Sequence, residues 1–341
     1  MASLPLVSVL MPCYNAADTL QEALLSLQCQ SLSDFEVIAV DDGSSDSTSV
    51  ILQEWASRDP RFRVITLSHQ GIIPALNAGL RACQAPYIAR MDADDRSHPE
   101  RLSKQLQFLE EHPQVGVLGC LVAGFPKDQV RQGFQVYIDW QNSLVTDADI
   151  RREIFVESPL VHPSVMLRRE LLHQVGGYQE HGWPEDYDLW MRLYLAGAVF
   201  AKVPSLLLEW REYPGRLTRQ DSRYSVENFL RLKANYLACG PLADHDAVLI
   251  WGAGMMGRRL SKHLLRLGVP LVAFFDVDPR KIGRTRLGLP VLSPDELPAR
   301  MNQYARPVLL AAVGARGARA LIRLRLADFG LREGIDWWSV A

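Results

Sequence analysis

Three carboxylates lie close together in the segment Met91-Asp92-Ala93-Asp94-Asp95. They follow the apolar run Pro86-Tyr87-Ile88-Ala89, which predicts a strand that carries a D-x-D pair to the edge of a sheet. Carboxylates this close repel one another unless a cation lies among them, and such oxygen ligands suit Mg²⁺ or Mn²⁺ beside a diphosphate. The alternative is a solvated acidic turn before a helix that begins near His98-Pro99-Glu100.

Two further groups of polar or aromatic residues also stand at the ends of apolar runs. Residues 6–11 lead into Pro12-Cys13-Tyr14, and residues 35–40 lead into Asp41-Asp42. Helix signals separate these runs, so strands and helices alternate with short connections, as in an α/β protein with a doubly wound sheet. Ligands bind beyond the carboxyl ends of the strands of such sheets. We therefore expect these groups and the acidic segment at one edge of the sheet.

Length and composition limit the class of protein. The 341 residues, 48% of them hydrophobic, suffice for two domains with separate cores. A formal net charge of -2 argues against nucleic acid as a partner. The five cysteines form no C-x-x-C pair, which favours reduced thiols in a cytoplasmic protein. No apolar run reaches the roughly 18 residues of a membrane span, and the N-terminal apolar stretch predicts a strand rather than a signal peptide.

The chain changes character near Gly240-Pro241, after an amphipathic helix expected at about residues 224–237. A second alternation of strands and helices begins there, with apolar runs at 247–251, 271–275 and 307–313. We therefore expect domains over residues 1–240 and 241–341. The arginines near residues 316–325 are spaced like the solvated face of a helix rather than a nucleic-acid patch.

Four segments in order carry a resemblance to a known family. They are Ser8–Asn15, Val40–Ser47, Met91–Asp95 and Trp183–Trp190. In sequence and order they resemble the landmarks of family 2 glycosyltransferases, which are inverting enzymes with the GT-A fold, a doubly wound mixed sheet. The resemblance covers roughly residues 4–235 and is specific for fold and reaction type. It implies a nucleoside diphosphate sugar as donor and a divalent cation, Mn²⁺ or Mg²⁺, as cofactor.

The resemblance assigns roles to individual residues. Tyr14 resembles the aromatic residue that lies against the nucleobase, although a core position at the strand end is an alternative. Asp42 matches the carboxylate that accepts a hydrogen bond from the base, and Asp94 matches the metal ligand. Asp95 either supports the metal through water or caps the next helix. Taken together, the expected nucleotide-sugar-binding residues are Pro12, Tyr14, Asp41, Asp42, Asp92 and Arg211.

Glu185-Asp186 matches the E-D motif of the family at the start of a predicted helix. An acceptor hydroxyl must lose its proton as it attacks, which requires a positioned carboxylate. We therefore expect Asp186 to be the general base and Glu185 to orient the acceptor. The segments His162–Arg169 and Gly176–Tyr178 resemble the stretch that leads to this motif and shapes the acceptor side.

One segment departs from the family pattern. Relatives often carry R-x-H-P-G-x-x-[ST], whereas this chain has Arg211-Glu212-Tyr213-Pro214-Gly215-Arg216-Leu217-Thr218. The histidine of the relatives can reach the metal or the diphosphate, but the phenol of Tyr213 is protonated at neutral pH and is a poor ligand. Arg211, Arg216 and Arg219 are candidates for compensating contacts with the diphosphate.

The second alternation contains a glycine motif, Gly252-Ala253-Gly254-Met255-Met256-Gly257, between a predicted strand and a helix. Asp276 follows at close to the ~20-residue offset of a dinucleotide site. The candidate nucleotide-binding residues here are Gly252, Gly254, Gly257 and Asp276. The segment resembles Rossmann-like domains found beside sugar-modifying enzymes. NAD, another nucleotide or sugar nucleotide, and a scaffold or homodimerising role all remain open.

The expected function is metal-dependent sugar transfer to a glycan or lipid-linked saccharide during cell-surface polysaccharide synthesis. We expect the protein in the cytoplasm, in peripheral contact at most with the inner face of the membrane. Two alternatives belong to other classes: an NAD-dependent sugar oxidoreductase, and a non-catalytic sugar-nucleotide-binding protein. The absence of an acid–base residue near residues 252–257 counts against the first, and the preserved acidic motifs count against the second.

Overall fold

The computed structural model describes residues 4–341, and the chain divides into two compact units. The first unit comprises the chain up to Ile150 together with Pro159–His181 and Glu185–Gln220. The second comprises Asp221–Ala341 and two short segments, Arg151–Ser158 and Gly182–Pro184. These two segments therefore pack with the second unit, although the chain on both sides of them belongs to the first.

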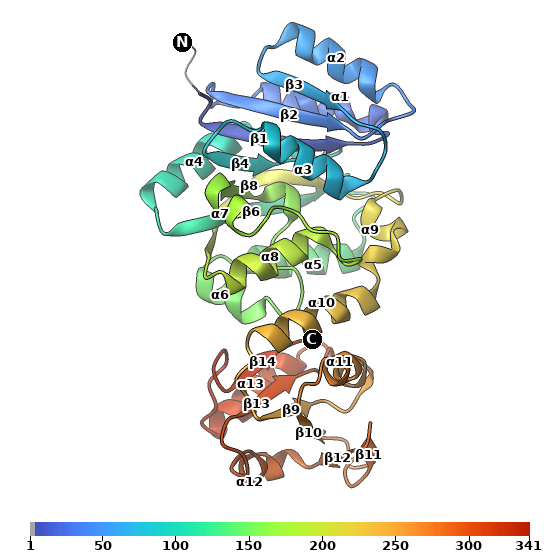
Figure 1. The fold of residues 1–341 in the computed structure, drawn as a ribbon, viewed down its shortest axis with the longest axis vertical. Helices are drawn as coiled ribbons and strands as arrows, with labels where there is room; N and C mark the ends of the chain where they lie inside the picture. The colour runs from blue at the N-terminus through green and yellow to red at the C-terminus, as the bar shows by residue number, and fades with distance from the viewer. Residues whose placement is uncertain (1–3) are drawn as a thin grey trace. The chain divides into compact units, whose positions relative to one another are not determined.

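The first unit is built on an eight-stranded mixed sheet with the strand order β3-β2-β1-β4-β7-β6-β8-β5. Figure 1 shows β3, β2 and β1 side by side in this sheet. Strands β1 to β4 pair in parallel, and β7 and β5 run antiparallel to their neighbours. The strands are β1 (Val7–Cys13), β2 (Phe35–Asp41), β3 (Phe62–Thr66), β4 (Tyr87–Arg90), β5 (Arg96–Ser97), β6 (Val115–Phe125), β7 (Met166–Arg168) and β8 (Val199–Arg211). The predicted α/β mixed sheet is confirmed.

Helices of the first unit pack apolar stripes against this sheet. In α1, buried Leu20, Leu24 and Leu27 recur at the three- and four-residue spacing of one helical face. The helix α3 begins at Ile72, directly after Gly71 with φ 99°. The helices are α1 (Ala17–Gln28), α2 (Thr48–Arg58), α3 (Ile72–Ala82), α4 (Arg101–Glu111), α5 (Gln132–Ser143), α6 (Asp147–Glu153), α7 (Arg169–Gln174), α8 (Glu185–Leu195) and α9 (Leu217–Gln220). Helix α6 begins in the first unit, and from Arg151 on its residues belong to the second.

The second unit contains a six-stranded sheet with the order β11-β12-β10-β9-β13-β14, parallel except for the β11/β12 pair. Its strands are β9 (Ala247–Trp251), β10 (Leu271–Phe275), β11 (Thr285–Arg286), β12 (Leu289–Leu292), β13 (Pro307–Ala311) and β14 (Trp337–Ser339). Its helices are α10 (Val226–Cys239), α11 (Met255–Arg266), α12 (Leu297–Met301) and α13 (Ala318–Asp328). Trp337 and Trp338 form a buried last strand.

Strand register in the first unit places the predicted site residues together. Strand β1 lies between β2 and β4, and Cys13 is level with Asp41. Arg90, the last residue of β4, pairs with Leu10 of β1. The segments that follow β1, β2 and β4 therefore leave the sheet at the same edge. Within residues 4–341, no helix has the length and apolar character needed to cross a membrane.

Candidate functional site

The three predicted carboxylates form one cluster. Ligand oxygens of Asp92, Asp94 and Asp95 all lie within 4.8 Å of one another. Asp95 is buried, and its Oδ1 accepts a hydrogen bond of 2.8 Å from the backbone N–H of Arg211, which ends β8. Asp95 thus faces the interior rather than simply capping α4. A set of hard oxygen donors at this spacing fits a divalent cation.

Burial and mutual repulsion disturb the acidity of the cluster. The pKa of Asp94 rises from its ordinary value of 3.8 to about 6, first because the carboxyl is desolvated and second because Asp92 is near. Burial and the neighbouring Asp94 also raise the pKa of Asp95 well above its usual value. Each carboxylate would be more stable as an anion beside a cation, which is the behaviour expected of metal ligands.

Arg90 is a member of the site that the sequence interpretation missed. Its guanidinium is 2% exposed and forms an ion pair with Asp92. Its Nε finds no hydrogen-bond partner among the described residues. A buried guanidinium needs acceptors, so Arg90 places a positive charge beside the acidic cluster and keeps a donor that can bind a further acceptor. The available signal was a charged residue closing an otherwise apolar strand.

Tyr14 and Asp42 are linked through His69, a residue that the sequence did not single out. Tyr14 is 47% exposed and stacks on His69, with ring centroids 4.0 Å apart and an interplanar angle of 16°. The core interpretation of Tyr14 is therefore wrong. His69 Nδ1 lies 2.9 Å from Asp42, whose carboxylate also accepts backbone N–H bonds from Gln70 at 2.9 Å and Gly71 at 2.8 Å.

Asp41 and Pro12 have local roles in the same region. Asp41 is buried, and its Oδ1 accepts a 3.0 Å bond from the backbone N–H of Ser44, which shapes the turn after β2. Pro12 lies within β1, level with Val40 of β2. Both residues fix the backbone that carries Tyr14 and Asp42.

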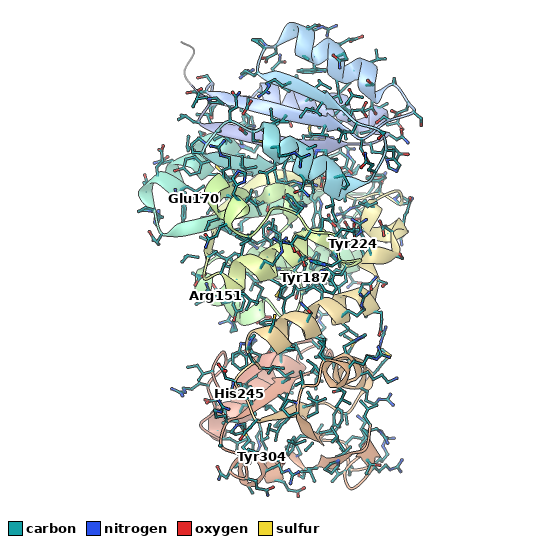
Figure 2. The ribbon with its side chains drawn as sticks, viewed as in Figure 1. Arg151, Glu170, Tyr187, Tyr224, His245 and Tyr304 are labelled. Atoms are coloured by element: carbon teal, nitrogen blue, oxygen red, sulfur yellow. The ribbon has the colours of Figure 1, made fainter. Side chains whose placement is uncertain are left out.

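Glu185 and Asp186 form the first turn of α8, next to Tyr187, which is labelled in Figure 2. Glu185 is 2% exposed. Burial, followed by the neighbouring Glu185 carboxylate, raises the pKa of half-buried Asp186 from its ordinary value of 3.8 to about 8. A carboxylate with this proton affinity suits a general base near neutral pH.

The chain leading to α8 is held by a buried polar network. His162 Nε2 lies 2.8 Å from the hydroxyl of Tyr178. Asn77 of α3 donates to the carbonyl of Tyr178 at 2.8 Å and accepts from its N–H at 3.0 Å. Burial lowers the pKa of His162 well below its usual value, so this imidazole is neutral. The two motif segments expected on the acceptor side therefore meet here.

Tyr213, the residue that departs from the expected family pattern, is close enough to Asp94 for the hydroxyl and the carboxylate to affect each other's pKa. Burial and the nearby acidic charge raise the pKa of this phenol, so it remains protonated. The arginines around it pair within the chain. Arg211 bonds Glu22 at 2.7 Å and also the carbonyl of Asp94, while Arg216 pairs with Glu212 at 3.0 Å and Arg219 pairs with the same carboxylate.

In the second unit, two of the three motif glycines are required by the backbone. Gly252 has φ 114°, and a Cβ on Gly257 would lie 2.0 Å from the carbonyl oxygen of Gly252. A Cβ on Gly254 would meet no atom within 4 Å, so the backbone there is open to approach. Asp276 accepts 2.9 Å bonds from the N–H of Ala253 and from Lys281 Nζ. Its carboxylate therefore fixes the glycine loop.

Two family models match the chain. The model for glycosyl transferase family 2 matches residues 8–176, and the model for a CoA binding domain matches residues 244–326. The amylovoran biosynthesis glycosyltransferase AmsE of Erwinia amylovora is 33% identical over 207 residues, covering 60% of this chain and 75% of that protein. The putative glycosyltransferase EpsE of Bacillus subtilis is 32% identical over 254 residues, covering 72% of this chain and 87% of that protein.

Solved structures share the fold at lower sequence identity. S. aureus TarS 1-349, crystallised with UDP-GlcNAc, aligns with a TM-score of 0.56 and 22% identity over 87% of this chain and 78% of that chain. The mannosyltransferase PcManGT from Pyrobaculum calidifontis, solved with GDP-Man and Mn²⁺, aligns with a TM-score of 0.50 and 19% identity over 96% of this chain and 81% of that chain. At such identities the likeness concerns the fold.

Proposed function

This chain belongs to glycosyl transferase family 2, and from that premise we propose that it moves a sugar from a nucleoside diphosphate sugar to a hydroxyl of a glycan or lipid-linked saccharide, inverting the anomeric carbon. The chain is a glycosyltransferase with a C-terminal Rossmann-like domain, as the resemblance implied. The relative named for amylovoran biosynthesis supports a role in polysaccharide synthesis, and we propose that the product is a cell-surface polysaccharide.

The observation that carries the proposal is the carboxylate cluster at the edge where β1, β2 and β4 end. Asp94 would hold a divalent cation, with Asp92 and Asp95 beside it. When bound, that cation would neutralise charge that develops on the departing diphosphate. Arg90 keeps the Asp92 carboxylate in place through its ion pair, and the Tyr213 hydroxyl lies near Asp94.

Residues on either side of the cluster would bind the nucleobase and remove the proton of the acceptor. Tyr14 offers an exposed ring for the nucleobase, and His69 braces it from one face. Asp186 takes the proton from the acceptor hydroxyl as the oxygen attacks, because its raised pKa gives it enough basicity. Glu185 strengthens that basicity by repulsion. Arg211 pairs with Glu22 and with the carbonyl of Asp94, and we therefore propose that it supports the cluster rather than contacts the diphosphate.

For the second unit we infer a nucleotide-type ligand near Gly254, where the backbone is open. Oxygens of Asp276 already serve Ala253, Asp278 and Lys281, so a ribose would have to compete for them. This favours a ligand held through its phosphates over NAD held through its ribose hydroxyls.

Calorimetric titration of the full chain tests the first proposal. The ligands are UDP, GDP and dTDP, each with Mn²⁺ and with EDTA, and the variant is Asp94→Ala. We expect one nucleotide to bind tightly in the presence of Mn²⁺ alone and to lose that binding in the variant. Nucleotide binding that is unchanged in EDTA and in Asp94→Ala, but is lost in Gly254→Val, would place the nucleotide in the second unit instead.

A further inference from the structure

We propose that Trp183 is a positioning residue for Asp186, anchored by helix α10 of the second unit. The proposal rests on the proposed role of Asp186 as general base. Gly182–Pro184 packs with the second unit, and the chain then passes directly into Glu185 and Asp186. Consecutive Cα atoms are about 3.8 Å apart, so a shift of the Trp183 backbone is carried into the first turn of α8.

The indole of Trp183 has two partners on α10. Its ring centroid lies 6.4 Å from that of Tyr236, with an interplanar angle of 65°, which is an edge-to-face contact. The guanidinium of Arg231 lies 5.6 Å from the ring centroid, within the range of a cation–π interaction. Pro184 follows and fixes its own φ, so little backbone freedom separates the indole from Glu185.

Helix α10 is itself held firmly within the second unit. Glu227 bonds Arg259 at 2.8 Å and His263 at 2.6 Å, and both partners lie on α11. Buried Lys233 donates to the carbonyl oxygens of Val156 at 2.5 Å and Val340 at 3.3 Å. Trp183 therefore packs on helix α10, which itself contacts several other elements of the second unit.

The other short segment of the second unit is anchored in a similar way. Glu153 is 3% exposed and pairs with Arg319 at 2.6 Å and Arg323 at 2.5 Å, both on α13. This corrects the expectation that these arginines only form a solvated helix face. Both short segments of the second unit thus have specific side-chain partners within that unit.

The test uses the full chain and the variants Trp183→Ala, Trp183→Phe and Trp55→Ala. Trp55 is a matched control, because it is also a partly buried tryptophan with a polar partner, Gln21 at 2.9 Å, but it lies on α2. The first measurement is hydrogen exchange of the peptide covering residues 182–195. The second is the pH profile of nucleoside diphosphate release from UDP-GlcNAc, GDP-mannose and dTDP-glucose with Mn²⁺, alongside nucleotide affinity.

We expect Trp183→Ala to speed exchange in the first turn of α8 and to lower kcat about 10- to 100-fold. Nucleotide affinity should stay within about twofold, and Trp183→Phe should recover most of the rate, since it retains an aromatic ring. Unchanged exchange at α8, or an equal loss of kcat in Trp55→Ala, would overturn the proposal. If the wild-type chain releases nucleotide from none of the donors, the proposed function fails, and the exchange data still decide the role of Trp183.

Discussion

Replacing Asp94 by asparagine should stabilise the metal-free protein while abolishing its response to Mn²⁺. Oxygens of the acidic cluster lie within 4.8 Å of one another. At that distance and an effective dielectric constant of about 20, two unit charges repel by about 3.5 kcal/mol. Asparagine keeps the shape of the side chain and an oxygen that can accept a hydrogen bond from the nearby hydroxyl of Tyr213. The substitution therefore removes the negative charge and changes little else.

The pKa of Asp94 gives a second route to the magnitude. It rises from 3.8 to about 6 on folding, and each unit corresponds to about 1.4 kcal/mol, so the ionised group costs the fold about 3 kcal/mol. The folded protein binds this proton more tightly than the unfolded chain does. The cost is therefore absent below about pH 4, grows between about pH 4 and pH 6, and is complete above that range.

Scanning calorimetry in EDTA and in Mn²⁺, at about pH 7.5 and about pH 4.5, checks both parts. At the higher pH in EDTA, Asp94→Asn should raise the transition of the first unit by about 6–12 °C, and the gain should shrink at the lower pH. Mn²⁺ should raise the wild-type transition and leave the variant unchanged.

Asp46→Asn is the control for the same substitution at a carboxylate with the opposite environment. Asp46 accepts backbone bonds from Ala17 at 3.1 Å and Thr48 at 2.9 Å, and these bonds contribute to its lowered pKa. Its substitution should lower the transition. A variant at Asp94 that is no more stable than the wild type in EDTA, or that Mn²⁺ stabilises equally, would refute the assignment of this cluster as the metal site.

Four further outcomes follow from the site and the glycine loop. Asp186→Asn should keep nucleotide affinity in calorimetry and lose about 10²- to 10⁴-fold in transfer; surviving transfer would place the base elsewhere. The value of kcat/KM should fall as pH drops below about 8, because Asp186 takes up a proton there. Glu185→Gln should move this fall to lower pH, and an unchanged pH dependence would show that Glu185 does not influence the protonation of Asp186. Tyr14→Ala should weaken nucleotide binding about tenfold, and equal affinity would remove Tyr14 from the base site. Gly257→Ala should destabilise the second unit by about 1–3 kcal/mol while Gly254→Ala does not, and equal melting curves would contradict the close contact at Gly257.

The parallel half of the first sheet was predictable because each strand and helix there carries its own signal. Apolar runs end on the turn residues that follow β1, β2 and β4, and the leucine spacing of α1 defines its buried face. The acidic cluster was predictable for the same reason, since its three members are adjacent in sequence. Each of these inferences depends on local pattern alone.

The partners of the cluster were harder to predict, because they come from distant parts of the chain. The 13-residue strand β8 was not expected, yet it delivers Arg211 to Asp95. His69 reaches Tyr14 only because the turn after β3 folds back on Asp42. Arg90 looked like the end of a strand, and its pairing with Asp92 depends on burial that sequence spacing does not report.

The hydrogen bond between Arg211 and Asp95 joins residues 116 positions apart in the chain. Contacts of such long sequence separation form late, because the loop they close must be ordered first. During synthesis, the carboxylate of Asp95 cannot gain this hydrogen-bond partner until β8 has left the ribosome. The acidic cluster therefore gains this long-range partner only after the chain that forms β1 to β4 has been synthesised.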